Sequence, residues 1–486
     1  MVSDLAKLKT KKELQEYLRN QTHIRFQDFI DAGRGEKLPF DKIYDKLRRL
    51  RGERGLSNSE AASAASLWGA RREGATIKHL SLAHHFPMSG RPYDLDELKR
   101  ALLEANAIIL STPVYFGDRS SLSQSLMEFI AANVEIKSAC AGKIYAGLAV
   151  GAKRNGGQET TLIYQMLDMV NLDFLAVGNS SETTSQYGGT CVAGDVGTLH
   201  DDDEGLETSI GTGQRAARVA QMMALGNNTK AKLSDRLKLQ LWLLQDVDKE
   251  KGRKHFESWA RDIEDVSGGT VDIQIIDVTK SSVTRCIACD ICPIDTGSKD
   301  KYRCIIKTSD DFFVKHHNDI IQADAVLLCA YSPSDRSQIT SVYQQFIERT
   351  RYLRRDNYVF SDLMMAPFVI GELSARQNLH LRMLTSSIRH HTVLHHPLIG
   401  MIHEGEILDS AALLERGLSF VKQSLKLTIG RYLTGPVEDV VYNPKGYEIS
   451  AQKAVEDKES GDTPESIKIN ALAYKEKSKR RLLLAD

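Results

Sequence analysis

The sequence predicts an α/β protein made of two tandem, doubly wound parallel-sheet domains, preceded by a helical extension and followed by a charged tail. Three observations lead to this prediction. The chain has 486 residues, which is too long for one ordinary core. Short apolar runs alternate with amphipathic helical patterns, which is typical of βαβ units. Two stretches of the chain also resemble each other, segment by segment and in the same order.

The domain limits follow from changes in composition along the chain. A polar stretch with Gly-Asn-Asn, "ALGNNTKAKLSDRLK", marks the join, and "EDKESGDTPESIKINALAYKEKSKRR" has too little apolar content for a core, so we expect an exposed or partner-wrapping tail. We therefore expect an extension over 1–45, a first domain over 46–226, a linker over 227–238, a second domain over 239–440 and a tail over 441–486.

Each expected strand is a short apolar run, and each is separated from the next by a helical pattern. Parallel strands buried on both faces read as such runs, and their ligands bind beyond the carboxyl ends of the strands. The expected strands are 75–82, 107–115, 144–151 and 173–179 in the first domain, and 239–245, 271–277, 324–330, 366–372 and 392–400 in the second.

The repeat is clearest in the stretches 107–130 and 325–347. Each is a strand-like run, a turn with Asp-Arg-Ser, and a helical pattern ending in Phe-Ile, and with one gap residues 118–120 align with 335–337. A second pair, "GLAVGAKRNGGQETTLIYQML" and "FVIGELSARQNLHLRML", follows in the same order. We expect a tandem duplication of one domain.

Composition excludes several function classes. The chain has 64 Lys and Arg against 64 Asp and Glu, so no net charge attracts it to nucleic acid or to an anionic membrane. No apolar run has the length of a membrane span, and we expect a cytoplasmic protein. Seven cysteines, an odd number, argue against a disulfide framework.

Polar and glycine-rich turns follow several of the expected strands of the first domain. In "RGERGLSNSE", Ser57, Asn58 and Ser59 open an Ala-rich helix, which suits either a phosphate or an ordinary helix cap. In "STPVYFGDRSS", Tyr115 can lie against a planar ligand or pack in the protein. The loops "GAKRNGGQETT" and "SQYGGT" add glycines that allow close backbone approach, or they are plain surface loops.

In order and spacing, these four motifs resemble the NADPH-dependent FMN reductase family of flavodoxin-like proteins, over roughly residues 52–223. The resemblance implies a flavodoxin-like fold and an FMN-binding first domain. It implies that the Ser-Asn-Ser segment holds the FMN phosphate, that the Pro-Val-Tyr-Phe segment borders the isoalloxazine, and that the loop around Gly156 contacts the polar edge of the ring. The implied cofactor-binding residues are Ser57, Asn58, Ser59, Pro113, Val114, Tyr115, Phe116, Gly151, Asn155, Gly156, Gly157, Gln158, Tyr187 and Gly188. The second copy lacks these motifs, and no side chain stands out as a catalytic acid or base.

The second copy instead carries four of the cysteines: Cys286, Cys289 and Cys292 as C-x-x-C-x-x-C, and Cys304 beyond a polar loop. This spacing suits a [4Fe–4S] cluster better than zinc, which is usually held by two separate C-x-x-C pairs. The stretch resembles the iron–sulfur flavoproteins, which implies that the four thiols are metal ligands; a loop without metal is the alternative. We expect Cys140, Cys191 and Cys329 to be buried packing residues.

Together these features predict an FMN-dependent oxidoreductase with one FMN and one [4Fe–4S] cluster. FMN takes a hydride and releases single electrons, whereas a cluster passes one electron at a time. We expect electrons to come from NAD(P)H or a protein donor and to reach a small-molecule or protein acceptor, with the two copies forming an intramolecular pseudo-dimer. The alternatives are an NAD(P)H:FMN or quinone reductase without a cluster, and a non-catalytic electron carrier or assembly subunit.

Overall fold

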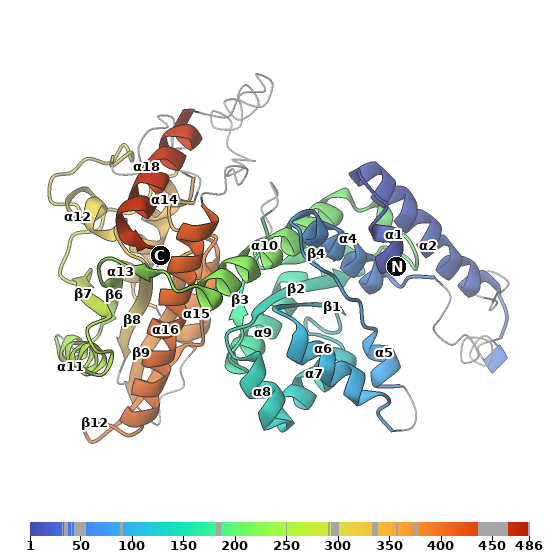
Figure 1. The fold of residues 1–486 in the computed structure, drawn as a ribbon, viewed down its shortest axis with the longest axis horizontal. Coiled ribbons are helices and arrows are strands. Elements are labelled where there is room, and N and C mark those ends of the chain that lie inside the picture. The colour runs from blue at the N-terminus through green and yellow to red at the C-terminus, as the bar shows by residue number, and fades with distance from the viewer. Residues whose placement is uncertain are drawn as a thin grey trace. The chain divides into compact units, whose positions relative to one another are not determined.

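Parallel strands connected by helices form both halves of the chain in the computed structural model (Figure 1). The chain divides into unit 1, residues 1–220, and unit 2, residues 221–486. The structure describes residues 1–31, 33, 37–39, 41–42, 55–87, 91–180, 186–248, 250–289, 292, 301–332, 339–355, 358–372, 378–435 and 465–484. Among them, no helix combines the length and the apolar character that crossing a bilayer requires.

The sheet of unit 1 is centred on β2 (Ile144–Gly151), which is buried along its whole length. It pairs in parallel with β1 (Ala107–Pro113) on one side, and with β3 (Leu175–Ala176) and β4 (Gly189–Val192) on the other. The uninterrupted apolar sequence of β2 is therefore that of a strand covered on both faces.

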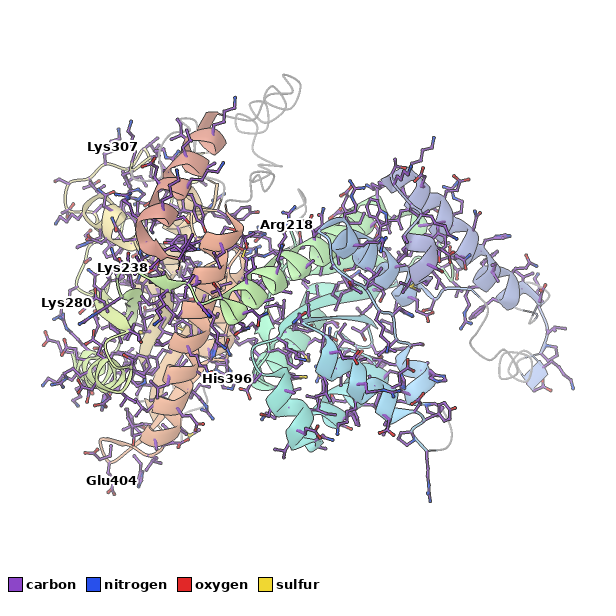
Figure 2. All side chains as sticks on the ribbon, in the orientation of Figure 1. Arg218, Lys238, Lys280, Lys307, His396 and Glu404 are labelled. Atoms are coloured by element: carbon purple, nitrogen blue, oxygen red, sulfur yellow. The ribbon has the colours of Figure 1, made fainter. Side chains whose placement is uncertain are left out.

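Helices cover both faces of this sheet, as expected of a doubly wound fold (Figure 1). The helices α4 (Asn58–Arg72) and α10 (Asp203–Asn228) lie on one face, and α6 (Leu95–Glu104), α7 (Ser121–Ala132), α8 (Val134–Cys140) and α9 (Gln158–Asn171) lie on the other. Arg218 of α10 donates two hydrogen bonds to the carboxylate of Glu73 at the end of α4, at 2.7 and 2.9 Å (Figure 2).

The N-terminal helices are part of the core of unit 1. The short helix α1 (Val2–Leu5) and the long helix α2 (Lys11–Asp31) bring buried leucines against the Ala-rich face of α4. Trp68 of α4 donates its indole N–H to the carbonyl of Leu8, at 3.0 Å. The alanines of α4 therefore allow helix α2 to pack close to it.

Unit 2 has the complete flavodoxin-like strand order. All its neighbouring long strands pair in parallel, in the spatial order β7-β6-β8-β9-β11, which in chain order is 2-1-3-4-5. The strands are β6 (Leu237–Asp246), β7 (Val271–Asp277), β8 (Ala325–Ser332), β9 (Met364–Glu372), β10 (Val393–Leu394), which pairs with β9, β11 (Leu398–His403) and β12 (Glu406–Ile407), which is antiparallel to β11. The helices are α11 (Lys251–Val266), α12 (Phe312–Ile320), α13 (Ser341–Arg349), α14 (Arg351–Arg355), α15 (Leu379–Ile388), α16 (Ser410–Thr434) and α18 (Glu465–Arg481).

The elements from β1 to β4 in unit 1 recur in the same order, with the same register, from β8 to β11 in unit 2. The strands to compare are β2 in unit 1 and β9 in unit 2. In each case the first residue of the strand pairs with a two-residue strand, and its fifth residue pairs with the next strand along the chain. The pairs are Ile144 with Leu175 and Leu148 with Gly189 in unit 1, and Met364 with Val393 and Phe368 with Leu398 in unit 2. This agreement supports a tandem duplication, which remains a proposal. The Asp-Arg-Ser of the second copy, 335–337, lies outside the described residues.

Three expected strands differ from the structure. Residues 75–80 adopt no regular structure, and α5 (Leu82–His85) follows directly, so the prediction of a strand over 75–82 is wrong. Its alternating polarity was compatible with a strand, but a strand also needs a hydrogen-bonded neighbour, and no described residue pairs with it. The strand expected over 173–179 is only β3, and the one over 392–400 is split into β10 and β11 around Pro397, which has no N–H for the ladder.

Half of the predicted linker over 227–238 is regular structure. Helix α10 continues through Gly226 to Asn228, β5 (Lys232–Leu233) follows, and β6 begins at Leu237. Gly226 does not end the helix because it serves packing: a Cβ here would overlap the carbonyl of Lys426 on α16. Reciprocally, a Cβ on Gly430 of α16 would overlap the carbonyl of Met222. The glycines therefore allow two helices to cross closely.

The end of the predicted tail is anchored in unit 2. Helix α18 is followed by β13 (Leu482–Leu483), which is antiparallel to β5. Arg481 forms an ion pair with the fully buried carboxylate of Asp324, at 2.6 Å, and donates to Asp235, at 2.8 Å. The prediction of an exposed tail is therefore wrong for this segment, because Arg481 meets the buried carboxylate of Asp324, which composition alone does not reveal.

Candidate functional site

The carboxyl ends of β1, β2 and β4 meet the start of α4 at one edge of the sheet of unit 1. After β1, the amide of Val114 donates to the carbonyl of Val150 at the end of β2, at 2.9 Å. The chain then reverses: Tyr115 and Asp118 exchange main-chain hydrogen bonds at 2.8 and 2.9 Å. Phe116 and Gly117 adopt left-handed φ values of 52° and 79° inside this turn, as a tight two-residue reversal requires.

This turn presents two aromatic rings to solvent. The side chain of Tyr115 is 58% exposed and that of Phe116 is fully exposed. Large aromatic side chains are usually at least partly packed. Their exposure at the ligand-binding edge of a parallel sheet leaves both rings available to a planar molecule.

The loop after β2 packs directly on this turn. Gly157 has φ 99°, and a Cβ on it would lie 3.0 Å from Gly117 Cα and 3.3 Å from Val114 Cγ1. Gln158 holds the loop from inside, since its Oε1 accepts from the amide of Gly156 at 2.8 Å and its Nε2 donates to the carbonyls of Lys153, at 2.7 Å, and Cys191, at 3.1 Å. Gln158 therefore fixes the loop from inside.

Ser57 caps helix α4, so the capping interpretation of the Ser-Asn-Ser motif is correct for this residue. Its Oγ accepts from the amide of Glu60 at 3.3 Å, while the Glu60 carboxylate accepts from the amide and the hydroxyl of Ser57 at 2.9 and 2.8 Å. Asn58 is also engaged: its side chain donates to the carbonyl of Asp195 at 3.2 Å and accepts from the amide of Leu199 at 3.4 Å.

Two main-chain donors remain at the start of α4. Among the described residues, the amides of Asn58 and Ser59 meet no acceptor, as is usual for the first turn of a helix. The carbonyl of Ser59 accepts from the hydroxyl of Ser111 on β1 at 2.8 Å, which fixes the helix start beside the carboxyl end of that strand. A helix start with such donors suits an anion.

Of the remaining predicted residues, two glycines have packing roles in this structure. A Cβ on Gly188 would overlap the carbonyl of Gly147, and the side chain of Asn179 donates to the Gly188 carbonyl at 3.2 Å. A Cβ on Gly151 would lie 2.6 Å from Gln158 Nε2. Asn155 has a left-handed φ of 58° in the loop after β2, and Tyr187 is half-buried beside Gly188. Gly188 and Gly151 let the segments of the edge approach one another.

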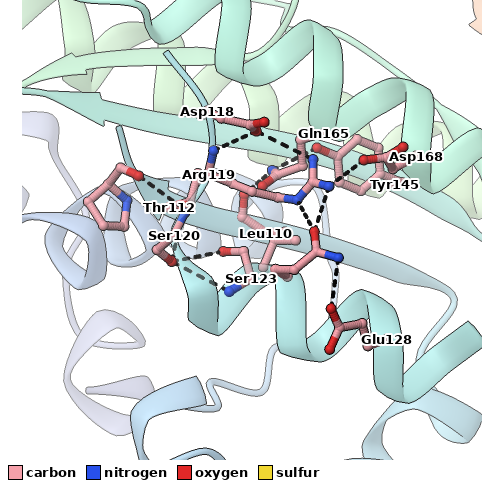
Figure 3. Close-up of polar contacts among 12 residues, drawn as sticks. Leu110, Thr112, Asp118, Arg119, Ser120, Ser123, Glu128, Tyr145, Gln165 and Asp168 are labelled. Carbon is pink, nitrogen blue, oxygen red and sulfur yellow. Dashed lines mark hydrogen bonds and ion pairs between the residues drawn. The ribbon is translucent and has the colours of Figure 1, made fainter. Parts of the chain in front are cut away.

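The Asp-Arg-Ser turn that marks the repeat is structural (Figure 3). Ser120 caps α7, and its amide donates to Thr112 Oγ1 at 2.9 Å. Arg119 is mostly buried and bridges two helices, because it donates to Gln124 of α7 at 2.7 and 2.9 Å and forms an ion pair with Asp168 of α9. Through these contacts, the tripeptide fixes the end of the aromatic turn to α7 and α9. The sequence predicted its recurrence but not this role, since Asp168 lies far along the chain.

In unit 2 the structure brings two of the four predicted metal ligands together. Cys292 and Cys304 are buried, at 9% and 6% exposure, and Cys286 and Cys289 are half-buried. A hydrogen bond from the Cys292 thiol, and after it a hydrogen bond from the main chain at Ile306 and the nearby charge of Arg349, lower the pKa of Cys304 to about 5. Among the described residues, no three His, Cys, Asp or Glu side chains gather as a metal site requires. As placed, the thiols therefore do not enclose a cluster, although 290–291 and 293–300 lie outside the described residues.

A buried ion pair anchors both ends of the cysteine segment. Arg349 and Asp311 are 1% and 0% exposed and form two hydrogen bonds at 3.1 Å. The same guanidinium donates to the carbonyl of Thr284 at 2.8 Å and to the hydroxyl of Tyr302 at 2.5 Å. Because Thr284 precedes the first cysteine and Tyr302 precedes the last, this arginine fixes the two ends of the segment. Sequence analysis missed it, since its partners are spread over many residues.

The corresponding edge of unit 2 is filled by side chains. Asp246, at the end of β6, accepts from the amides of Asp248 and Arg253 at 3.2 Å, so a carboxylate lies at the start of α11. A Cβ on Gly252 would overlap the side chain of Tyr331 from β8. The Tyr331 ring stacks on His255, with centroids 5.7 Å apart. In unit 2, the position equivalent to the start of α4 is therefore occupied by the Asp246 carboxylate and by the stacked rings of Tyr331 and His255.

As predicted, the three isolated cysteines are buried. Burial raises the pKa of Cys140 and Cys329, and it raises the pKa of Cys191 to about 12. These thiols are packing residues with little thiolate character.

Comparisons with known proteins agree with the geometry of unit 1. The family described as NADPH-dependent FMN reductase matches residues 53–184. An iron-sulfur flavoprotein of Methanocaldococcus jannaschii is 38% identical over 130 residues, which are 27% of this chain and 66% of that protein. An iron-sulfur flavoprotein of Methanosarcina thermophila is 28% identical over 131 residues, which are 27% of this chain and 64% of that protein. This chain thus spans less than two thirds of the length of these relatives.

A solved structure of a flavodoxin from the domain Archaea aligns with 39% of this chain and 99% of its own, at 12% identity and a TM-score of 0.25, a similarity from which we draw no inference. The family match, in contrast, covers the start of α4, the aromatic turn and the loop after β2, the segments that form the edge described above. On this match, residues 53–184 of unit 1 are similar to the NADPH-dependent FMN reductase family, and the parallel α/β fold agrees with that similarity.

Proposed function

We propose that this chain is an FMN-dependent oxidoreductase that binds one flavin at the carboxyl edge of unit 1. One observation carries the proposal: segments predicted separately as flavin-binding meet at this edge. Gly157 touches the turn at Val114 and Gly117, and Ser59 is tied to β1 through Ser111. FMN would use three features of this edge. They are two exposed aromatic rings, two helix amides that meet no acceptor among the described residues, and a close glycine contact that an added Cβ would fill.

The chain's own residues would bind and orient the flavin. The amides of Asn58 and Ser59 and the hydroxyl of Ser57 would hold the phosphate at the positive end of the α4 dipole. Tyr115 and Phe116 would border the ring system and exclude water from it. The main chain at Gly156 and Gly157 would face its polar edge. When bound, FMN supplies hydride acceptance and single-electron release, and the protein contributes position and environment.

The first experiment is titration of the purified chain with FMN, for which we expect one equivalent to bind. Gly157→Ala should weaken binding at least tenfold, because the new methyl group would press on Gly117 and Val114 and strain the left-handed backbone. Gly74→Ala is the matched control: Gly74 also has a left-handed φ, 84°, but no atom lies within 4 Å of an added Cβ. Failure of the wild-type chain to bind FMN under any condition would refute the proposal.

A [4Fe–4S] cluster on Cys286, Cys289, Cys292 and Cys304 is a second, finer proposal. Their spacing supports it, as does the contact between Cys292 and Cys304, and two relatives are named iron-sulfur flavoproteins. Since the thiols do not surround a common centre in this structure, loading would require the segment to rearrange. Anaerobic reconstitution followed by iron and sulfide analysis tests this. Cys289→Ser should abolish bound iron without changing FMN affinity, whereas Cys329→Ser should change neither.

The filled edge of unit 2 supports a single flavin per chain. Asp246 already occupies the anion position, and Tyr331 and His255 occupy the space beside it. A bound FMN to chain ratio near two would contradict this.

Donor and acceptor remain proposals: NAD(P)H or a protein donor, and a small-molecule or protein acceptor in the cytoplasm, with the two copies as an intramolecular pseudo-dimer. The alternatives are an NAD(P)H:FMN or quinone reductase without a cluster and a non-catalytic electron carrier or assembly subunit. Steady NAD(P)H oxidation with a small acceptor would favour an enzyme, whereas flavin reduction only by a protein donor would favour a carrier.

A further inference from the structure

The start of helix α4 already holds a negative charge of its own. The Glu60 carboxylate accepts hydrogen bonds from the amide of Ser57 at 2.9 Å and from its hydroxyl at 2.8 Å. Ser57 in turn accepts from the amide of Glu60 at 3.3 Å, which completes a capping box. The Ser57 hydroxyl, which would hold the phosphate, and the Ser57 amide beside it are therefore both occupied by a side chain from the same helix turn.

Glu60 differs from the carboxylate that fills the corresponding position of unit 2. Asp246 is at the end of a strand and accepts from the amides of Asp248 and Arg253, and Gly252 packs tightly on Tyr331 next to it. Glu60 is only half-buried, and Ser57 is the hydrogen-bond partner of its carboxylate among the described residues, with His79 near enough to feel its charge. Rotation of one flexible side chain is thus enough to release the start of α4, whereas the start of α11 stays blocked.

We propose that the Glu60 carboxylate competes with the flavin phosphate for Ser57 and so lowers the affinity of the chain for phosphorylated flavin. This inference rests on the proposed function. A phosphate monoester carries about −1.5 to −2 charges at neutral pH. The phosphate and the carboxylate cannot share the same two donors, and they repel each other at the positive end of the helix dipole.

Glu60→Gln tests the charge without removing the cap, because glutamine at this position also completes a capping box. We expect the Kd for FMN to fall about tenfold at low salt, equivalent to ~1.4 kcal/mol, and the gain to shrink as salt screens the charges. The Kd for riboflavin, which has the same ring but no phosphate, should change by less than about twofold. Quenching of flavin fluorescence on binding measures both constants without any activity assay.

Glu104→Gln is the matched control. Glu104 is an exposed residue at the C-terminal end of α6, just before β1 begins, so it lies at the opposite edge of the same sheet. This variant makes the same change in net charge and should alter neither constant.

The outcomes separate the inference from the proposed function. If the wild-type chain binds FMN but Glu60→Gln leaves its Kd unchanged or raises it, the inference is refuted and the flavin site stands. Equal tightening of FMN and riboflavin also refutes it, because the effect would then act on the ring. A wild-type chain that binds neither flavin refutes both.

Discussion

Replacing Asp311 by asparagine should destabilise unit 2 strongly, because it leaves the buried charge of Arg349 without its counter-ion. The two side chains are 1% and 0% exposed and share two hydrogen bonds at 3.1 Å. Removing one partner of such a pair costs about 3–5 kcal/mol, a large part of the roughly 5–15 kcal/mol that stabilises a domain. Asparagine keeps an oxygen that can cap α12 by accepting from the amide of Phe313, so most of the loss would come from the ion pair.

Urea unfolding followed by tryptophan fluorescence measures this loss in unit 2. The chain has three tryptophans, and a Trp68→Phe background leaves only Trp242 and Trp259, both in unit 2. Trp242 lies 5.5 Å from Phe346 on α13, the helix that carries Arg349, so it reports on the affected region.

Asp310→Asn is the matched control, since Asp310 is the exposed neighbour of Asp311 and its replacement should cost less than about 0.5 kcal/mol. A double variant with Arg349→Met and Asp311→Leu should lose less stability than the two single variants added together, because no unpaired charge remains. A loss below about 1 kcal/mol for Asp311→Asn, or equal losses for the two asparagine variants, would refute the reasoning.

Three further predictions concern other parts of the chain. Arg119→Ala should lower the free energy of unfolding of unit 1 by about 1–3 kcal/mol, measured by Trp68 fluorescence, since Arg119 links Asp168 to α7; an unchanged midpoint would contradict this. Acidification from pH 6.5 to about 4 should destabilise unit 2, because burial lowers the pKa of His395 from 6.5 to about 4 and only the unfolded chain binds that proton in this window; the His395 part of the loss is on the order of 3 kcal/mol at most, and His395→Gln should remove that part and leave the part due to His390, whose pKa burial lowers to about 3. Alkylation of the native chain should modify the half-buried Cys286 before the buried Cys329; mass spectrometry showing the reverse order would contradict the burial.

The corresponding strands and helices of the two halves were predictable, because the apolar patterns that indicate them are local in the sequence. Strand-like runs at 107–113 and 325–332 and their following helices are recognisable from apolar spacing alone, and the structure has strands and helices there. The common register of β2 and β9 was not predictable, since pairing depends on where distant strands stop. Local patterns determine which segments become strands, whereas hydrogen-bonding partners determine how long they are.

The errors have the same cause. Gly226 suggested a turn, yet it lies within α10. Helix α16 packs so closely against it that a side chain at this position would not fit. The residues near Arg481 suggested a solvated tail, yet that arginine meets a buried carboxylate at Asp324. In each case a distant segment overrides the local preference, and sequence spacing holds no information about that segment.

By itself, the sequence determined that the chain is α/β, which segments follow the strands of the first half, and that four thiols are concentrated in the second half. It could do so because apolar periodicity, turn residues and cysteine spacing are local properties. Only the tertiary structure decided that Glu60 occupies donors at the start of α4, that Asp246 fills the equivalent position in unit 2, and that Cys292 and Cys304 lie in contact. These facts depend on the direction of side chains and on charges brought together by folding, and no pattern along the chain specifies them.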